Sequence, residues 1–199
     1  MNKNEKMVGK DYITCGIFSA LCIVIMLISS VMNITGYTAL FYPAVVAFFV
    51  GILLVVLNSK VQKRGAIFIF SIIPCAYFFT SGVIEGIFGA IGLLIFATLA
   101  EVILWKNHND IKKIILSSVV YVLNLATVGF AQNFLNTETY CANALAHGIN
   151  ETVVEQMRML YSIKPLWIVV IAATALLGFV GAILGKKLMK KHLKRAGII

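Results

Sequence analysis

The sequence predicts an all-α integral membrane protein with six transmembrane helices and with both termini in the cytoplasm. Of its 199 residues, 60% are hydrophobic and 13% are charged, whereas a soluble domain carries about twice that share of charged residues. The apolar residues form long runs, suited to helices that cross a bilayer. The Lys and Arg residues lie in clusters between alternate runs, which is the pattern that orients membrane proteins. We therefore expect a single transmembrane domain over residues 1–199.

Five apolar segments precede the last one, over about residues 12–32, 36–57, 65–80, 83–105 and 114–131. Pro43 is expected to bend the second segment, because proline lacks the amide N–H that a helix interior requires. The third segment is short and contains Pro74. Basic or charged turns follow the second and fourth segments, so we expect separate helices on either side of each turn.

The last apolar segment begins at Pro165, a residue that helices tolerate in their first turn, and has no charged residue up to Leu184. At about 1.5 Å per residue, its length matches a hydrocarbon core of about 30 Å. Small residues on this segment form a face that allows two membrane helices to approach closely, namely Gly178, Gly181, Ala182 and Gly185. The basic residues that follow are Lys186, Lys187, Lys190, Lys191, Lys194 and Arg195.

These basic residues also predict the orientation of the whole chain. All but two of the 17 Lys and Arg residues lie in the N-terminal segment, the two charged turns or the C-terminal tail. The exceptions, Arg158 and Lys164, lie between the fifth and sixth spans. Positively charged loops stay in the cytoplasm, so we expect a multi-pass protein of the bacterial cell membrane. The net charge of +9 comes from clusters at helix ends, a distribution that does not indicate a nucleic-acid partner.

Residues 132–163 form a polar segment that is too long for a turn. We expect two short surface helices there, one ending at Gly148 and the other beginning at Asn150. Thr152 and Glu155 have the spacing of a capping box at the start of the second helix. This helical extracellular loop is the segment most like a lid over a binding site.

Polar and ionisable side chains within or beside the spans are the candidates for a substrate site, because such groups are costly in lipid. Asn124 lies in the fifth span, where an interhelical hydrogen bond is the alternative interpretation. Glu85 lies at the outer end of the fourth span, where it could instead pair with Arg158 or Lys164. The outer tyrosines also match an interfacial aromatic belt. The predicted substrate-binding residues are Asn33, Tyr37, Tyr42, Glu85, Asn124, Gln132, Asn133, Arg158 and Tyr161.

Metal binding and catalysis are weakly indicated. Side chains of the outer loop could ligate a haem or another metal chelate, namely Tyr140, Cys141, His147, Met157 and Met159. Their spacing specifies no coordination geometry, so ordinary loop residues are the simpler interpretation, and we predict no metal site and no cofactor. The sequence contains no HExxH, GxSxG or Walker motif, so we predict no catalytic residue and do not expect an enzyme.

Glu101, near the inner end of the fourth span, is expected to pair with Lys106 or to contact a partner.

Two stretches resemble a known family. The C-terminal sequence GFVGAILGKKLMKKHLKRAGI, residues 178–198, is similar to the signature of the Trep_Strep (MptD-type) membrane proteins. Residues 11–21 resemble the opening helix of that family, and Glu101 matches its recurrent acidic position before a cytoplasmic turn. Members of the family are regarded as substrate-binding S components of energy-coupling factor (ECF) transporters.

The resemblance implies that the protein captures a micronutrient, such as a vitamin-like compound, haem or a metal chelate, at the extracellular face. It also implies docking on a transmembrane coupling subunit with two ATPase subunits that drive uptake. Gly16 and Ala20 match the family's docking positions on the first helix, and Cys15 and Ser19 form a parallel small pair. Packing within the bundle is the alternative role of these residues. A second interpretation of the whole protein is a structural or assembly protein that packs against partner helices and binds no small ligand.

Overall fold

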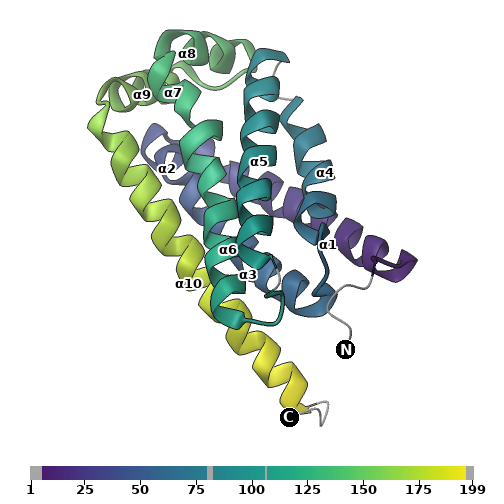
Figure 1. The fold of residues 1–199 in the computed structure, drawn as a ribbon. Helices are drawn as coiled ribbons and strands as arrows, with labels where there is room; N and C mark the ends of the chain where they lie inside the picture. The colour runs from purple at the N-terminus through teal and green to yellow at the C-terminus, as the bar shows by residue number, and fades with distance from the viewer. Residues whose placement is uncertain (1–5, 80–82, 106, 196–199) are drawn as a thin grey trace.

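The structure is a computed structural model that describes residues 6–79, 83–105 and 107–195; the side chains of 83–85 and 191–195 lie outside this description. Every regular element in these ranges is helical, which confirms the predicted all-α class (Figure 1). In chain order the elements are α1 (Gly9–Ser29), η1 (Ser30–Ile34), α2 (Gly36–Leu40), α3 (Tyr42–Val61), α4 (Ala66–Phe78), α5 (Val83–Leu104), α6 (Ile111–Asn124), η3 (Leu125–Gly129), α7 (Ala131–Leu135), α8 (Thr137–Ala146), α9 (Glu151–Ser162) and α10 (Pro165–Arg195).

Within the described part of the chain, five helical segments are long and apolar enough to cross a membrane, namely Gly9–Ile34, Tyr42–Val61, Gly86–Leu104, Ile111–Leu135 and Pro165–Lys190. The other apolar helix, α4, has 13 residues. At about 1.5 Å per residue it is shorter than a hydrocarbon core of about 30 Å. The structure therefore supports an integral membrane protein with five candidate spans, and the predicted third span is the one that falls short.

Pro43 separates two helices and does not bend a single one. α2 ends at Leu40, and α3 begins at Tyr42 with Pro43 in its first turn. Proline is favoured there because the first turn of a helix needs no amide N–H from that position. The prediction of one helix over 36–57 is therefore wrong. Pro74, in contrast, lies inside α4 without ending it.

α3 and α10 share the most extensive contact between two helices of the bundle. A Cβ atom added at Gly181 would lie 2.0 Å from the carbonyl oxygen of Phe48, and one at Gly185 would lie 2.9 Å from that of Ile52. The two backbones can approach this closely only because these positions have no side chain. This confirms a helix-packing face on α10 at the predicted small residues, Gly178, Gly181, Ala182 and Gly185.

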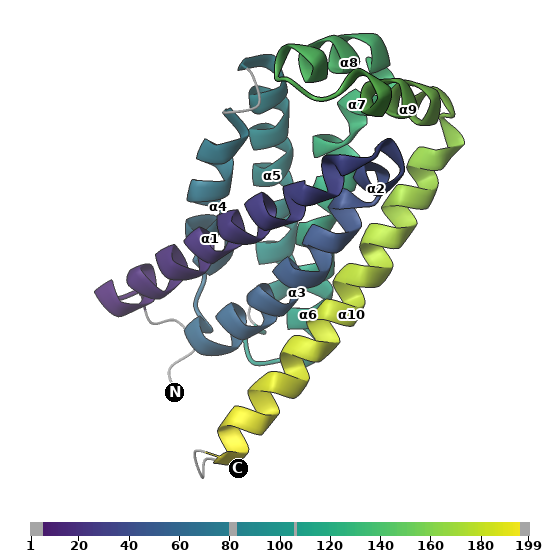
Figure 2. The same ribbon diagram turned by 180° about the vertical axis from the view of Figure 1, so that it is seen from behind.

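The turn between α3 and α4 ties together several helix ends. Lys63 donates to the Asp11 carboxylate at 2.8 Å and so holds the start of α1 against this turn. The guanidinium of Arg64 lies 4.3 Å from the ring centroid of Trp105, just past the end of α5. From this end α1 crosses the other helices obliquely, as Figure 2 shows, and packs on α3 and α4.

The helices α7, α8 and α9 cover the opposite end of the bundle (Figures 1 and 2). The two predicted surface helices are confirmed as α8 and α9. Gly148 follows α8 with a φ of 81°, a conformation that glycine adopts without steric cost. The cap of α9 differs from the prediction, because the Asn150 side chain accepts the Thr152 amide at 2.8 Å. The predicted start at Asn150 is confirmed, and the cap is the Asn150 side chain in place of a capping box of Thr152 and Glu155.

Candidate ligand-binding site

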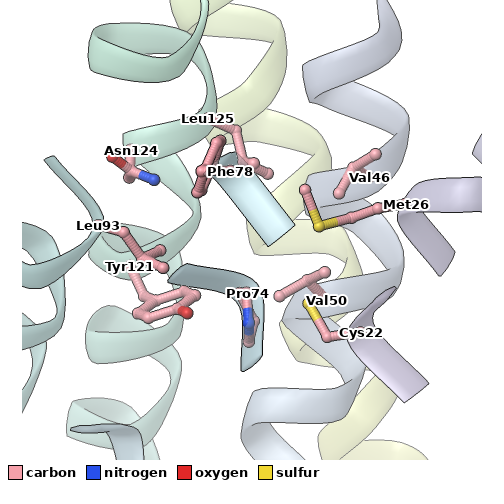
Figure 3. A pocket seen from close by; sticks show the side chains of 10 residues that line it. All are labelled: Cys22, Met26, Val46, Val50, Pro74, Phe78, Leu93, Tyr121, Asn124 and Leu125. Atoms are coloured by element: carbon pink, nitrogen blue, oxygen red, sulfur yellow. The ribbon is translucent and has the colours of Figure 1, made fainter. Parts of the chain in front are cut away.

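A small cavity lies inside the bundle where α1, α3, α4, α5 and α6 meet (Figure 3). Its volume is about 10 Å³, which is room for one water molecule. None of its lining side chains is charged at neutral pH; they are Cys22, Met26, Val46, Val50, Pro74, Phe78, Leu93, Tyr121, Asn124 and Leu125. Among the described members of the predicted substrate-binding set, Asn124 is the one that lines this cavity.

Asn124 is the last residue of α6, and its side chain is fully buried. Neither Nδ2 nor Oδ1 has a hydrogen-bond partner in the described part of the chain. Figure 3 shows the amide nitrogen turned toward the other lining residues. The oxygen faces α5, since a Cβ atom at Gly92 would lie 2.8 Å from it. The structure therefore shows no interhelical hydrogen bond for this amide, and an unpaired buried group of this kind costs about 1–3 kcal/mol.

The helix changes type directly after Asn124. Residues Leu125–Gly129 form the π-helical turn η3, which leads through Phe130 into α7. A π turn is rare, shifts the register of the helix by one residue and is frequent at functional sites. Val128 of this turn lies over Gly92, where a Cβ atom would be 2.5 Å from its Cγ1. The unpaired amide and the irregular turn thus share one contact surface on α5.

Four tyrosines form a chain of contacts that runs from beside the cavity to α8 and α9. The hydroxyl of Tyr42 lies 3.4 Å from the backbone oxygen of Met26, a cavity residue. Tyr42 is also close enough to Tyr77 and Tyr140 for an electrostatic interaction. The rings of Tyr140 and Tyr161 meet edge to face at 5.6 Å. We call these four residues, Tyr42, Tyr77, Tyr140 and Tyr161, the tyrosine layer.

The two loop tyrosines of this layer are neutral at physiological pH. Burial raises the pKa of Tyr140 and that of Tyr161 above the usual range of a phenol. Tyr161 is fully buried, and the rings of Phe134 and Phe130 lie 5.1 and 5.7 Å from its own. These side chains therefore form a packed cluster of uncharged phenols and apolar rings.

The two cations of residues 132–164, Arg158 and Lys164, are engaged with groups of the same segment. Arg158 donates to the Glu138 carboxylate at 3.1 Å and also pairs with Glu155. Lys164 donates to the backbone oxygens of Phe134 and Tyr161. The predicted partner of these cations, Glu85, lies in α5 with a side chain outside the described residues.

The remaining predicted residues are spread over the same end of the bundle. Gln132 accepts a hydrogen bond from Asn136 at 2.6 Å, and Asn133 is buried in α7. Tyr37 is exposed in α2, and Asn33 is partly exposed in η1. The structure does not bring these four side chains to the inner cavity.

Sequence reasoning missed most of the cavity lining because these side chains are apolar or aromatic. Tyr121 could have been found, since it precedes Asn124 by three positions and so lies on the same face of α6. Its hydroxyl forms a hydrogen bond with Ser71 of α4 at 3.2 Å. Cys22, Met26 and Phe78 carry no local signal that separates a cavity wall from ordinary packing.

Two of the potential haem ligands within residues 132–163 differ in exposure. Cys141 is fully buried between α8 and α9, and its Sγ lies 3.9 Å from the backbone oxygen of Val154. His147 is exposed at the end of α8, with Nδ1 at 2.7 Å from the Asn143 oxygen. Within the described residues no three His, Cys, Asp or Glu side chains form a group that could hold a metal ion.

Glu101 caps a neighbouring helix. Its Oε1 accepts the Ile67 amide at 2.8 Å, in the first turn of α4. Gly65, which precedes α4 with a φ of 86°, has no side chain that could cap the helix itself. The structure shows this cap where we expected an ion pair, and Lys106, the expected partner, lies outside the described residues.

The four predicted docking residues lie on two sides of α1. Cys15 and Ser19 are fully buried, and the Ser19 hydroxyl donates to the Phe70 backbone oxygen of α4 at 2.6 Å. The prediction that this pair faces a partner is therefore wrong, because both residues pack within the bundle. Gly16 and Ala20 lie toward the open side: a Cβ atom at Gly16 would meet no atom within 4 Å, and Ala20 is exposed.

Comparison with known sequences places the chain in a family. Residues 9–195 match the sequence model of a family described as a hypothetical bacterial integral membrane protein (Trep_Strep). No match was found among curated proteins or among solved structures. The matched range extends from the first residue of α1 to the last residue of α10. The chain therefore belongs to the Trep_Strep family of bacterial integral membrane proteins.

Proposed function

We propose that the protein is the substrate-binding S component of an ECF-type importer. It would capture a micronutrient at the extracellular face and dock on a transmembrane coupling subunit with two ATPase subunits. Membership of the Trep_Strep family and the inner cavity beside Asn124 support this proposal. The observation that carries it is the uneven burial of α1, which packs by one face and leaves the other uncovered.

The uncovered face of α1 suits close contact with another helix. Ile13, Ile17 and Leu21 are 66, 56 and 43% exposed, and Gly16 and Ala20 lie among them. In lipid, helices associate through van der Waals contact, and small residues allow their backbones to approach. This face is therefore the docking surface that we propose for the coupling subunit.

The alternative, a structural protein that packs against partner helices through its glycine faces, has less support. The glycine face of α10 is already filled by α3, as the contacts of Gly181 and Gly185 show. A purely structural bundle would also gain stability by replacing the unpaired amide of Asn124 with an apolar side chain.

The docking proposal predicts that the double substitution Gly16→Leu and Ala20→Leu separates the protein from its partners. A Cβ atom at Gly16 meets no atom within 4 Å and Ala20 is exposed, so two leucine side chains would extend from the uncovered face of α1 where a partner helix has to approach. Tagged wild-type protein, purified gently from its own cells, is expected to retain a coupling subunit and ATPases. The double variant should retain them at least about tenfold less, a loss equal to about 1.4 kcal/mol of association free energy.

The matched control is Ala172→Leu, which enlarges an exposed small residue on α10. It should retain the same partners as the wild type, because no docking face is proposed there. Mass spectrometry of the purified complexes measures this directly. Equal retention by the double variant, or a wild type that carries no ATPase subunit, would contradict the proposed function.

We further propose that α8 and α9 lie outside the cell and that the turn after α5 lies inside, as the distribution of basic residues predicts. Thr139→Cys in α8 should then react with a membrane-impermeant maleimide in intact cells, and Asn109→Cys only after permeabilisation; both positions are exposed. The native Cys141 gives little background, because burial raises the pKa of its thiol and hides it from reagent. The opposite labelling pattern would reverse the proposed orientation.

A further inference from the structure

We infer that the inner cavity beside Asn124 binds an uncharged ring compound that accepts a hydrogen bond. Asn124 is the residue that selects it. The inference rests on the proposed function in one respect only, namely that the bound compound is the transported substrate. The binding itself is a property of the isolated chain and can be tested without any partner.

The first argument concerns charge. The cavity is lined by apolar groups, a neutral amide and a neutral phenol. The two cations of the loop, Arg158 and Lys164, are held by carboxylates and backbone oxygens. A carboxylate or an ammonium group on the ligand would lose its hydration without gaining an opposite charge, which is unfavourable in a buried site. The site is therefore suited to uncharged compounds.

The second argument concerns the hydrogen bond. The Asn124 nitrogen is a donor without a partner, and it is turned toward the cavity (Figure 3). A carbonyl oxygen or a ring nitrogen on the ligand would satisfy it. On the α5 side, Gly92 has no side chain and so leaves room for the Asn124 amide. The π turn begins at the residue after Asn124. The unpaired donor and the irregular helix are two independent features that both indicate a site at this point.

The third argument concerns the walls. Phe78 and Tyr121 present aromatic rings, and Met26 presents a flexible thioether that adapts to the shape of a ring. The cavity has room for one water molecule, so a ring has to displace lining side chains as it enters. Met26 and Phe78 are the members that can do this by rotation, whereas Pro74 and the β-branched Val46 and Val50 are stiff. Flat compounds require the smallest displacement.

Benzamide and benzoate test this inference on the full chain purified in detergent. They have the same ring and nearly the same shape, but benzamide is neutral and benzoate carries a negative charge. We expect saturable binding of benzamide, with a rise in the midpoint of thermal unfolding, and binding of benzoate that is at least about tenfold weaker. Titration calorimetry and thermal unfolding measure both quantities.

Asn124→Leu should weaken benzamide binding by at least about tenfold. It should not lower the midpoint of unfolding, because the Asn124 amide forms no hydrogen bond within the described residues that the substitution could remove. The matched control is Asn58→Leu. Asn58 is also a buried amide with an unpaired Nδ2, but it lies on α3 outside the cavity lining. Its substitution should leave benzamide binding unchanged.

Three outcomes would overturn the inference: equal binding of benzoate and benzamide, unchanged binding by Asn124→Leu, or no saturable binding of benzamide. The comparison of benzamide with benzoate uses the wild-type protein alone. It therefore tests the inference even if a variant does not fold. Retention of ATPase subunits by a protein that fails this test would leave the proposed function standing. Selective benzamide binding by a protein that retains no partner would instead support the site and contradict the importer.

Discussion

Gly181→Ala is expected to cost more stability than any other single methyl group that could be added to the α3–α10 contact. The new Cβ atom would lie 2.0 Å from the Phe48 carbonyl oxygen, so the two helices must separate. Overpacking of this kind costs about 3 kcal/mol. For a chain of this length, that loss lowers the midpoint of thermal unfolding by about 10 °C.

The control for this experiment is Gly16→Ala. Alanine is favoured over glycine inside a helix by about 1 kcal/mol, and this term applies equally at both positions. The Cβ atom at Gly16 meets no atom within 4 Å, so the higher helix propensity of alanine is the only effect on stability that we expect there. We expect unchanged or slightly higher stability for Gly16→Ala, measured by thermal unfolding in the same detergent. A Gly181→Ala protein as stable as the Gly16→Ala protein would contradict the α3–α10 packing.

Glu101→Leu is expected to destabilise the protein by about 3 kcal/mol, because it removes the acceptor for the first turn of α4. The Ile67 amide would lose its partner at a site where water cannot replace it. Backbone amides at Gly65 and Phe68 also lie close to this carboxylate. The short helix α4 begins inside the bundle and has no capping side chain of its own, so its start depends on this contact.

Glu101→Gln separates this role from the effect of charge. Glutamine keeps a carbonyl oxygen that can accept the Ile67 amide, so it should preserve more than half of the stability that leucine loses. Thermal unfolding of the three proteins in one detergent gives the ranking. Equal stability of the leucine variant and the wild type would show that α4 does not need the cap.

Several features of the fold followed from local properties of the sequence. Hydropathy and charge predicted five of the spans and the membrane class, because the cost of a charged group in lipid acts on each segment separately. The spacing of Gly178, Gly181 and Gly185 predicted the packing face of α10, since close helix contact requires small residues at that spacing. Turn residues such as Gly148 predicted where α8 ends.

The site was less predictable, because its residues come from five helices. Asn124 could be singled out as a polar residue in an apolar span, but the absence of a hydrogen-bond partner depends on what α4 and α5 place around it. The cavity walls at Met26, Phe78 and Leu93 are apolar and look like any packing residue in the sequence. Arg158 was predicted to face a ligand, and its pairing with Glu138 comes from the contact between α8 and α9.

Hydrophobic runs along the chain thus predicted which segments become helices, whereas contacts between distant residues decided which face of each helix points inward. α1 illustrates the reason. A membrane helix is apolar toward lipid as well as toward its neighbours, so its hydrophobic pattern does not mark the buried side. The inner position of Ser19 depends on the Phe70 carbonyl, and the inner position of Glu101 depends on the Ile67 amide. Such partners meet only when the helices pack.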